Sequence, residues 1–194
     1  MAPEFEEFTI VDNIGLLLEQ NIEDVRKDRK NSRWIYPSFP ESNENLPQIV
    51  IEFDSPSYET ESANEYLDEE YVGNIYKIYY YKRAQANINF HIISLRDYGY
   101  NVTYDGVTSY QKNQKLNSYI ANSVNKFLLS HRNEIEEFCS RFEVVSKDIA
   151  FEDGESKWAS TITAEVHYRE LWTTEYIDGK LIKSYTLGVE TKWV

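Results

Sequence analysis

A stretch of alternating residues near the C-terminus constrains the fold of this chain more than any other feature. Between residues 161 and 169, every second side chain is polar or charged, and the side chains between them are apolar or aromatic. The polar set is Thr161, Thr163, Glu165, His167 and Arg169, and the other set is Ile162, Ala164, Val166 and Tyr168. Because successive side chains of a strand point to opposite faces of a sheet, residues 158–172 are predicted to form a strand with one wet face and one buried face.

More strands are predicted on both sides of this stretch. Residues 142–149 precede it, and residues 175–177 and 180–189 follow it. Asp178-Gly179 is the strongest hairpin signal in the chain, since that pair suits a type I′ turn between two strands. The C-terminal part of the chain is therefore expected to form several antiparallel strands.

The first half of the chain supplies further strands. Residues 46–53 hold a continuous apolar run after Pro47, as expected for a strand that is buried on both faces. Residues 74–83 and 87–96 are rich in Tyr and Ile and are predicted to form a hairpin, with residues 83–87 as its connection. Residues 97–106 contain Gly, Asn and Asp and are predicted to form a loop.

Two helices are predicted from apolar side chains that recur every three or four residues. The first follows Thr9 and ends near Lys30, and its apolar stripe is Ile10, Ile14, Leu17, Leu18, Ile22 and Val25. The second spans about residues 109–139, and its stripe is Leu116, Ile120, Val124, Phe127, Leu128, Ile135 and Phe138.

This order of elements predicts the architecture of the whole chain. The expected fold is α+β, with a largely antiparallel (mixed) sheet, two main helices packed on one side of it, and a strand-rich C-terminal region. A length of 194 residues fits one domain over residues 1–194. Residues 55–73 are polar and acidic, and they are predicted to form an acidic loop inserted between strands.

The charges are divided sharply along the chain. Residues 41–71 carry ten acids and no Lys or Arg, whereas residues 72–96 carry four bases and no acid. A self-assembling subunit can use two complementary patches of this kind, so we expect contacts between 55–71 of one copy and 74–96 of the next. The alternative is a solvated loop beside an ordinary pair of strands.

The composition also limits the partners and the compartment. A net charge of −13 argues against broad contact with DNA or anionic lipid. A basic cluster between residues 26 and 33 is expected to be favourable charge at a helix C-terminus. The single cysteine, Cys139, excludes an internal disulfide and favours a reducing compartment. No signal peptide or membrane span is expected, because the acidic start and the rest of the chain lack a long apolar run.

Catalytic signatures are weak. The chain has no phosphate-binding loop, dinucleotide-binding or zinc-protease motif, and its histidines, His91, His131 and His167, fall on separate predicted elements. We therefore expect no catalytic residue, no cofactor and no metal site. One alternative is a metal-dependent nuclease that uses Glu190-Thr191-Lys192 together with Asp54 or Glu52. Another is an adaptor that binds a basic partner through its acidic segment at residues 41–71.

The order of elements is similar to that of a known family. An amphipathic helix at residues 10–25 precedes a short strand at 47–53 that carries an acidic side chain near its end. An aromatic strand pair at 76–96, a helix at 116–138 and terminal strands then follow. This layout resembles the tail-terminator and tail-completion (head–tail neck) proteins of tailed bacterial and archaeal viruses.

The resemblance implies a structural subunit without catalysis. Such a protein closes into a homo-oligomeric ring, typically a hexamer, that caps the tail tube and joins it to the head-completion or connector protein. It implies a location in the virion tail or neck after assembly in the host cytoplasm, with DNA only passing through the lumen and no contact with a membrane.

Overall fold

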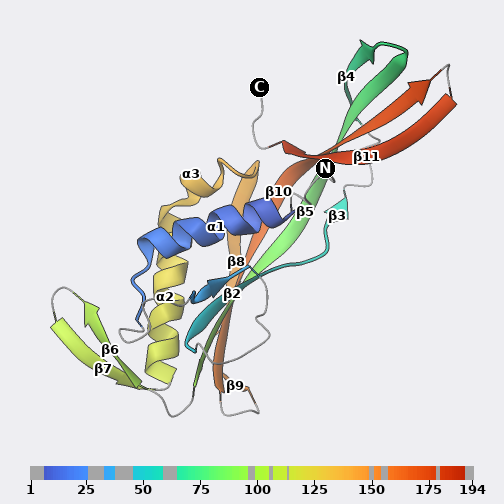
Figure 1. Cartoon of the computed structure of the whole chain (residues 1–194). Helices are drawn as coiled ribbons and strands as arrows, with labels where there is room; N and C mark the ends of the chain where they lie inside the picture. Colours follow the sequence, from blue (N-terminus) through green and yellow to red (C-terminus); the bar gives the residue numbers. More distant parts are fainter. Residues whose placement is uncertain are drawn as a thin grey trace.

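The structure of the chain is a computed structural model (Figure 1). It describes residues 7–25, 33–37, 46–58, 65–95, 99–104, 107–112, 114–148, 151–153, 157–177 and 180–190. Within these residues the fold is α+β, and a large mixed sheet carries helices on one side, as the sequence predicts.

Two long strands form the spine of the molecule. Strands β5 (Ile75–Leu95) and β10 (Lys157–Ile177) each contain 21 residues, and they pair antiparallel over their whole length. The register runs from Ile75 opposite Ile177 to Leu95 opposite Lys157. We call this pair the central ribbon. Its two halves have different neighbours, and this difference divides the molecule into a base and an arm.

In the base, the central ribbon is widened on both edges. Strand β2 (Gln48–Phe53) pairs with β5, and β1 (Ile35–Tyr36) pairs with β2 in the only parallel pairing among the described strands. Strands β8 (Arg141–Lys147) and β9 (Phe151–Asp153) pair with β10 on the other edge. The short β3 (Ser57–Tyr58) pairs with β5 near the middle of the ribbon.

The helices cover one face of the base. Helix α1 is Glu7–Asn21, α2 is Gln114–Ser130, and the single turn α3 is Arg132–Ile135. Their apolar stripes, which include Ile10, Ile14, Ile120 and Val124, are buried in one core with the inward side chains of β2, β5 and β10. Burial of this stripe explains why the helices lie here, because an amphipathic helix gains most of its stability from packing its apolar face.

A buried amide ties α2 to the sheet. Asn117 is fully buried, and its side-chain amide donates to the carbonyl oxygens of Ile92 at 2.8 Å and Trp158 at 2.9 Å. The hydroxyl of Ser160 donates to Asn117 Oδ1 at 2.5 Å. The helix is therefore joined by hydrogen bonds to both strands of the central ribbon.

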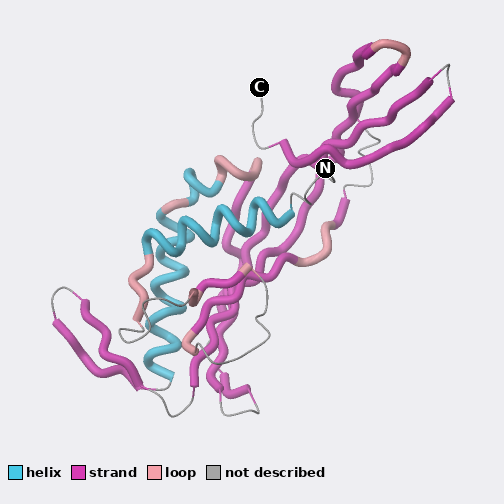
Figure 2. The backbone as a smooth tube through the Cα atoms, in the orientation of Figure 1, coloured by secondary structure: helices cyan, strands magenta, loops and turns pink. Residues whose placement is uncertain are grey.

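The arm extends away from the helices (Figures 1 and 2). It consists of β4 (Glu65–Val72), the outer halves of β5 and β10, and β11 (Lys180–Glu190). A separate hairpin of β6 (Gly99–Tyr104) and β7 (Val107–Lys112) extends from the opposite end of the molecule in Figure 1.

Cross-strand ladders hold the arm together. Lys77 lies opposite both Glu70 and Glu175, and its Nζ is 3.8 Å and 3.7 Å from their carboxylate oxygens. Tyr76 lies opposite both Tyr71 and Tyr176 in the same three strands, and its ring centroid is 4.6 Å from that of Tyr71. Opposite charges and aromatic pairs at such positions stabilise neighbouring strands.

Several elements confirm the predictions from the sequence. Strand β2 lies within residues 46–53, β8 matches residues 142–149 closely, and β10 contains residues 158–172. Strands β10 and β11 pair from Ile177 opposite Lys180, which confirms the hairpin predicted from Asp178-Gly179, although these two residues lie outside the described part of the chain.

The predicted hairpin of residues 74–96 is wrong, because β5 runs through them as one strand. Residues 83–87 form no turn, and each of them pairs with β10, between Arg169 and Glu165. This segment contains no Gly or Pro to break the strand, and the ladder with β10 satisfies its backbone groups. Residues 158–172 and 175–177, predicted as separate strands, likewise belong to one strand, β10.

The acidic loop predicted at residues 55–73 is also wrong in the part that the structure describes. Residues 57–58 form β3, and residues 65–72 form β4. Strand β4 pairs with the basic, Tyr-rich strand of the same chain, so the acids meet these bases within one molecule. Residues 59–64 lie outside the described part of the chain.

Three other segments differ from the prediction. The helix predicted at 109–139 begins at Gln114 and is interrupted at His131, and residues 107–112 before it form β7. The loop predicted at 97–106 contains β6, because this Tyr-rich segment pairs with β7. Helix α1 ends at Asn21 and not near Lys30, and most of the basic cluster between residues 26 and 33 lies outside the described residues.

Candidate interaction site

The pairing of β10 changes at one point along the central ribbon. Strand β11 ends at Glu190 opposite Arg169, and β8 begins at Arg141 opposite His167. Both strands lie on the same edge of β10. At Tyr168, the neighbour of this edge changes from β11 of the arm to β8 of the base. The change of neighbour leaves room for a pocket beside the ribbon.

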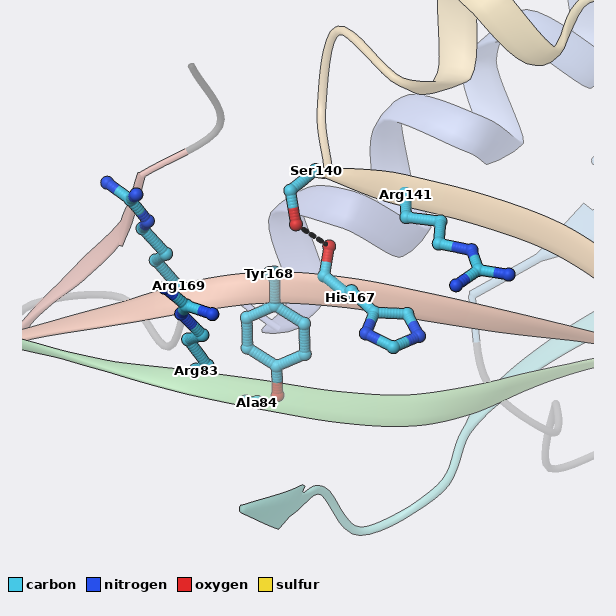
Figure 3. A pocket seen from close by; sticks show the side chains of 7 residues that line it. All are labelled: Arg83, Ala84, Ser140, Arg141, His167, Tyr168 and Arg169. Atoms are coloured by element: carbon cyan, nitrogen blue, oxygen red, sulfur yellow. Dashed lines mark hydrogen bonds between the residues drawn. The ribbon is translucent and has the colours of Figure 1, made fainter. Parts of the chain in front are cut away.

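A pocket of about 280 Å³ lies at this junction (Figure 3). We call it the waist pocket, and its lining residues are Arg83, Ala84, Ser140, Arg141, His167, Tyr168 and Arg169. In Figure 3, Arg83 and Arg169 lie toward one end of the pocket, and Arg141 and His167 lie toward the other.

The waist pocket is basic, although the chain carries a net charge of −13. Arg83 and Arg169 are directly opposite each other in the ladder of β5 and β10. Like charges at such a position oppose strand pairing, so the ribbon keeps this pair at a cost in stability. Arg169 also lies over the ring of Tyr81, with its guanidinium carbon 4.4 Å from the ring centroid.

Hydrogen bonds order the base side of the waist pocket. The backbone N–H and the hydroxyl of Ser140 both donate to the carbonyl oxygen of His167, at 2.8 Å and 2.7 Å. The Nε2 of His167 lies 2.7 Å from a carboxylate oxygen of Glu165, and Gln85 donates to the other oxygen at 2.7 Å. The hydrogen bond with His167 lowers the pKa of Glu165 below its usual value.

The hydrogen-bond donors of the waist pocket are suited to binding an anion, and they are not arranged for catalysis. A guanidinium presents planar N–H donors that match carboxylate and phosphate oxygens, and this group stays charged at any physiological pH. The hydroxyl of Ser140 is occupied by a backbone carbonyl, so it is not arranged as a nucleophile. The arrangement supports recognition of a negatively charged group.

The outer end of the arm has the opposite character. We call the residues of β4 with exposed side chains the arm tip, and they are Tyr66, Asp68, Glu69, Glu70, Tyr71 and Val72. The exposed fraction is 56% for Tyr66, 74% for Tyr71 and 51% for Val72. The arm tip therefore combines large exposed aromatic and apolar side chains with three carboxylates.

Contacts within the arm fix the carboxylates of the arm tip. The hydroxyl of Tyr76 donates to Glu69, and that of Tyr79 donates to Glu70. The hydrogen bond to Glu69 is the main reason why the pKa of Tyr76 rises to about 12. Tyr76 therefore stays protonated and remains a donor at physiological pH.

The structure does not bring together the residues of the nuclease hypothesis. Glu52 accepts a hydrogen bond in its contact with His91 at 3.0 Å, and Asp54 accepts one from Asn89 at 3.2 Å. Both lie in the base, whereas Glu190 pairs with Arg169 near the arm. From the strand spacing and the rise per residue, Glu190 and Glu52 are separated by roughly 20 Å or more. Lys192 lies outside the described residues.

No other chemical centre was found in the described part of the chain. It contains no group of three or more His, Cys, Asp or Glu side chains that could hold a metal ion. Cys139 is fully buried, and burial raises the pKa of its thiol to about 12, so it is unreactive at neutral pH. Among the same residues, no helix is both long and apolar enough to cross a membrane.

Comparisons with known proteins give no family for the chain. None of the protein-family models matches it, and neither does any of the curated proteins that were compared. The waist pocket and the arm tip are therefore the features of the molecule that bear on its function.

The sequence alone did not single out the waist pocket. The sequence predicts Arg169 on the wet face of its strand, but it predicts Arg83 at one end of a hairpin connection. Arg83 and Arg169 are brought together by the register of β5 against β10, and no local sequence pattern specifies that register.

Proposed function

We propose that the protein is a structural subunit that assembles into a homo-oligomeric ring in the tail or neck of a tailed virus. The arm carries this proposal, because it extends away from the helix-covered base and exposes Tyr71 and Tyr66 at its tip. Exposed tyrosines at the end of a stiff projection are the type of surface that a neighbouring subunit buries, since tyrosine is enriched at interfaces.

The distribution of patches favours a ring over a symmetric dimer. The arm tip and the waist pocket differ in charge, and they lie at different places along the ribbon. A contact between two different patches is heterologous, and repeated heterologous contacts close into a ring where the rotation between subunits permits it. The edge strand β4 carries several acids, which discourage uncontrolled edge-to-edge pairing.

The ring would act at the junction between tail and head. In this proposal, a hexamer ends the tail tube, binds the tube protein on one side and contacts the head-completion or connector protein on the other. The acidic composition keeps phosphates from binding tightly while DNA passes through the lumen. The subunit needs no cofactor, metal or catalytic residue for this role, and it is incorporated into the virion after assembly in the host cytoplasm.

Mass measurement in solution tests the assembly. Native mass spectrometry and analytical ultracentrifugation should give a closed oligomer of one size, and negative-stain electron microscopy should show rings with a central opening. Adding isolated tail tubes from the same virus should place the rings at one tube end. A protein that stays monomeric at high concentration, with tubes present or absent, overturns the proposal.

A cleavage assay tests the competing enzymatic function. Linear and supercoiled DNA are incubated with the protein and Mg²⁺, and the Lys192→Ala variant is the matched control. The proposal predicts no cleavage by either protein. Cleavage by the wild type that is lost in Lys192→Ala would instead establish the nuclease.

A further inference from the structure

We infer that the arm tip of one copy binds in the waist pocket of the next copy through carboxylate–guanidinium pairs. The inference rests on the proposed assembly into a ring, and it specifies which surfaces make the contact. The occupant of the waist pocket is thus a second copy of this chain, and the ligand groups are carboxylates of Asp68, Glu69 and Glu70.

The chemistry of the two surfaces is complementary. The waist pocket is lined by Arg83, Arg141 and Arg169, and the arm tip has an acidic, exposed strand. Carboxylates accept two parallel hydrogen bonds from a guanidinium, which provides geometric specificity as well as energy. Complementary charge of this kind also accelerates association and excludes wrong partners.

The carboxylates of the arm tip and the guanidinium groups of the waist pocket can form further hydrogen bonds beyond their contacts within the chain. Glu69 and Glu70 accept from tyrosine hydroxyls, but a carboxylate has about four lone-pair sites and can accept further hydrogen bonds. Arg83 and Arg169 make other interactions within the chain. A guanidinium has five N–H donors, so each arginine can serve more than one partner.

The geometry of the central ribbon prevents this contact within one molecule. The carboxylates of Asp68, Glu69 and Glu70 belong to residues that pair with positions 77–79 of β5, and Arg83 lies four to six residues further along that strand. At about 3.4 Å per residue, these residues are separated from Arg83 by roughly 14–20 Å along the strand. Strands β5 and β10 are paired without interruption between these points, so the arm cannot fold back onto its own waist pocket.

The same separation suits a neighbouring subunit. The acids of the arm lie roughly 14–20 Å beyond the chain's own waist pocket, so they can extend onto the next copy. In two adjacent copies, the arm tip of one can therefore bind in the waist pocket of the other. The aromatic side chains beside the acids, Tyr66 and Tyr71, would then be buried in the same contact.

A charge-swap experiment tests the inference. Arg83→Glu reverses the charge of the waist pocket, and it places an opposite charge across from Arg169, so pairing of β5 with β10 should not suffer. The double variant Asp68→Lys/Glu69→Lys reverses the arm tip. Each variant alone is expected to weaken self-association by roughly 30-fold or more. A single chain that carries both reversals has complementary charges again and should assemble.

Matched controls separate this effect from net charge and from folding. Lys126→Glu on α2 changes the net charge as Arg83→Glu does, and Glu134→Lys/Glu137→Lys reverses two exposed acids near α3. Both controls should assemble like the wild type. Arg141→Glu provides a second reversal of the waist pocket at an exposed position, should Arg83→Glu fail to fold.

Cross-linking identifies the contact directly. A chain with Asp68→Cys and Arg141→Cys is treated with a short bis-maleimide, which cannot bridge the two sites within one molecule. Cys139 is buried with a raised pKa and should not react. The expected product is a ladder that ends at the size of the ring. Rings that form without this ladder and survive both charge reversals overturn the inference but not the ring, whereas a strictly monomeric wild type overturns both.

Discussion

At the scale of single residues, Asn117 shows how one polar side chain can define the packing of a helix. Its amide is buried between α2 and the central ribbon and is paired with backbone groups of Ile92 and Trp158. A buried amide without partners would be costly, so the helix is stable in only one position along the sheet. The apolar side chains around it supply most of the burial, and Asn117 supplies the alignment.

Replacement of Asn117 by Ala should reduce the stability of the whole fold. The variant leaves two backbone carbonyls and the hydroxyl of Ser160 without their partner in a buried place. The expected loss in the free energy of unfolding is about 2–4 kcal/mol. Urea unfolding measures it, and Asn122→Ala on the exposed face of α2 is the control, with a change expected within about 0.5 kcal/mol. Equal effects of the two variants would contradict the role of Asn117.

Glu165 should make part of the stability dependent on pH. Its contact with His167 lowers the pKa of the carboxyl group in the folded state. A lowered pKa means that the stabilisation is fully present above the pKa of the unfolded chain and is lost as the pH falls through the folded pKa. Glu165→Gln should therefore be less stable than the wild type at pH 7, and the difference should disappear in acid. Urea unfolding at pH 7 and at pH 3 tests this, and a difference that is independent of pH would contradict it.

At the scale of elements, turns decide whether neighbouring strands form separate hairpins or one long ribbon. Strand β4 is joined to β5 by Gly73 and Asn74, with Val72 opposite Ile75. Gly73 has a φ of 66°, a left-handed conformation that other residues adopt at a cost. This pair is a hairpin signal of the same kind as Asp178-Gly179, and it marks the true turn of the arm.

Two Gly→Ala variants should have effects of opposite sign. Gly73→Ala strains the turn and should destabilise the arm by about 1 kcal/mol, because the methyl group disfavours the left-handed region. Gly15→Ala lies inside α1, where the added carbon would be 3.6 Å from Ile51, and it should be neutral or stabilise by up to about 1 kcal/mol. Hydrogen exchange locates the effects, with faster exchange expected in residues 65–81 only for Gly73→Ala. Faster exchange in the base would contradict this local effect.

Much of the fold follows from local patterns, but the site does not. The alternation at residues 161–169 and the stripe of Ile10, Ile14 and Leu18 predict the buried faces of β10 and α1. The continuity of β5 through residues 83–87 was not predictable in this way, because it depends on pairing with a strand about 80 residues away in the sequence. The register that places Arg83 opposite Arg169 has the same origin, so the waist pocket required the tertiary structure.

At the scale of the whole molecule, the uneven distribution of charge acquires a structural meaning. Acids and bases that are separate in the sequence meet within the arm, where Lys77 lies between Glu70 and Glu175. The remaining complementary surfaces are the arm tip and the waist pocket, at different points of one stiff ribbon. In the proposed ring, neighbouring copies satisfy both surfaces through repeated contacts between two different patches.

The exposed aromatic ring of Tyr71 should matter for assembly and little for folding. Its side chain stacks on Tyr76 but remains 74% exposed, so truncation removes little burial from the single chain. Truncation of a tyrosine that acts as an interface hot spot costs about 2 kcal/mol or more, so Tyr71→Ala should weaken self-association by at least about 30-fold while the melting temperature of the unassembled chain changes little. Leu129→Ala on α2 is the control, because Leu129 is 61% exposed but lies on the helical side of the base. Sedimentation velocity across a concentration series measures both variants, and equal association of Tyr71→Ala and Leu129→Ala would show that the arm tip is not buried in the assembly.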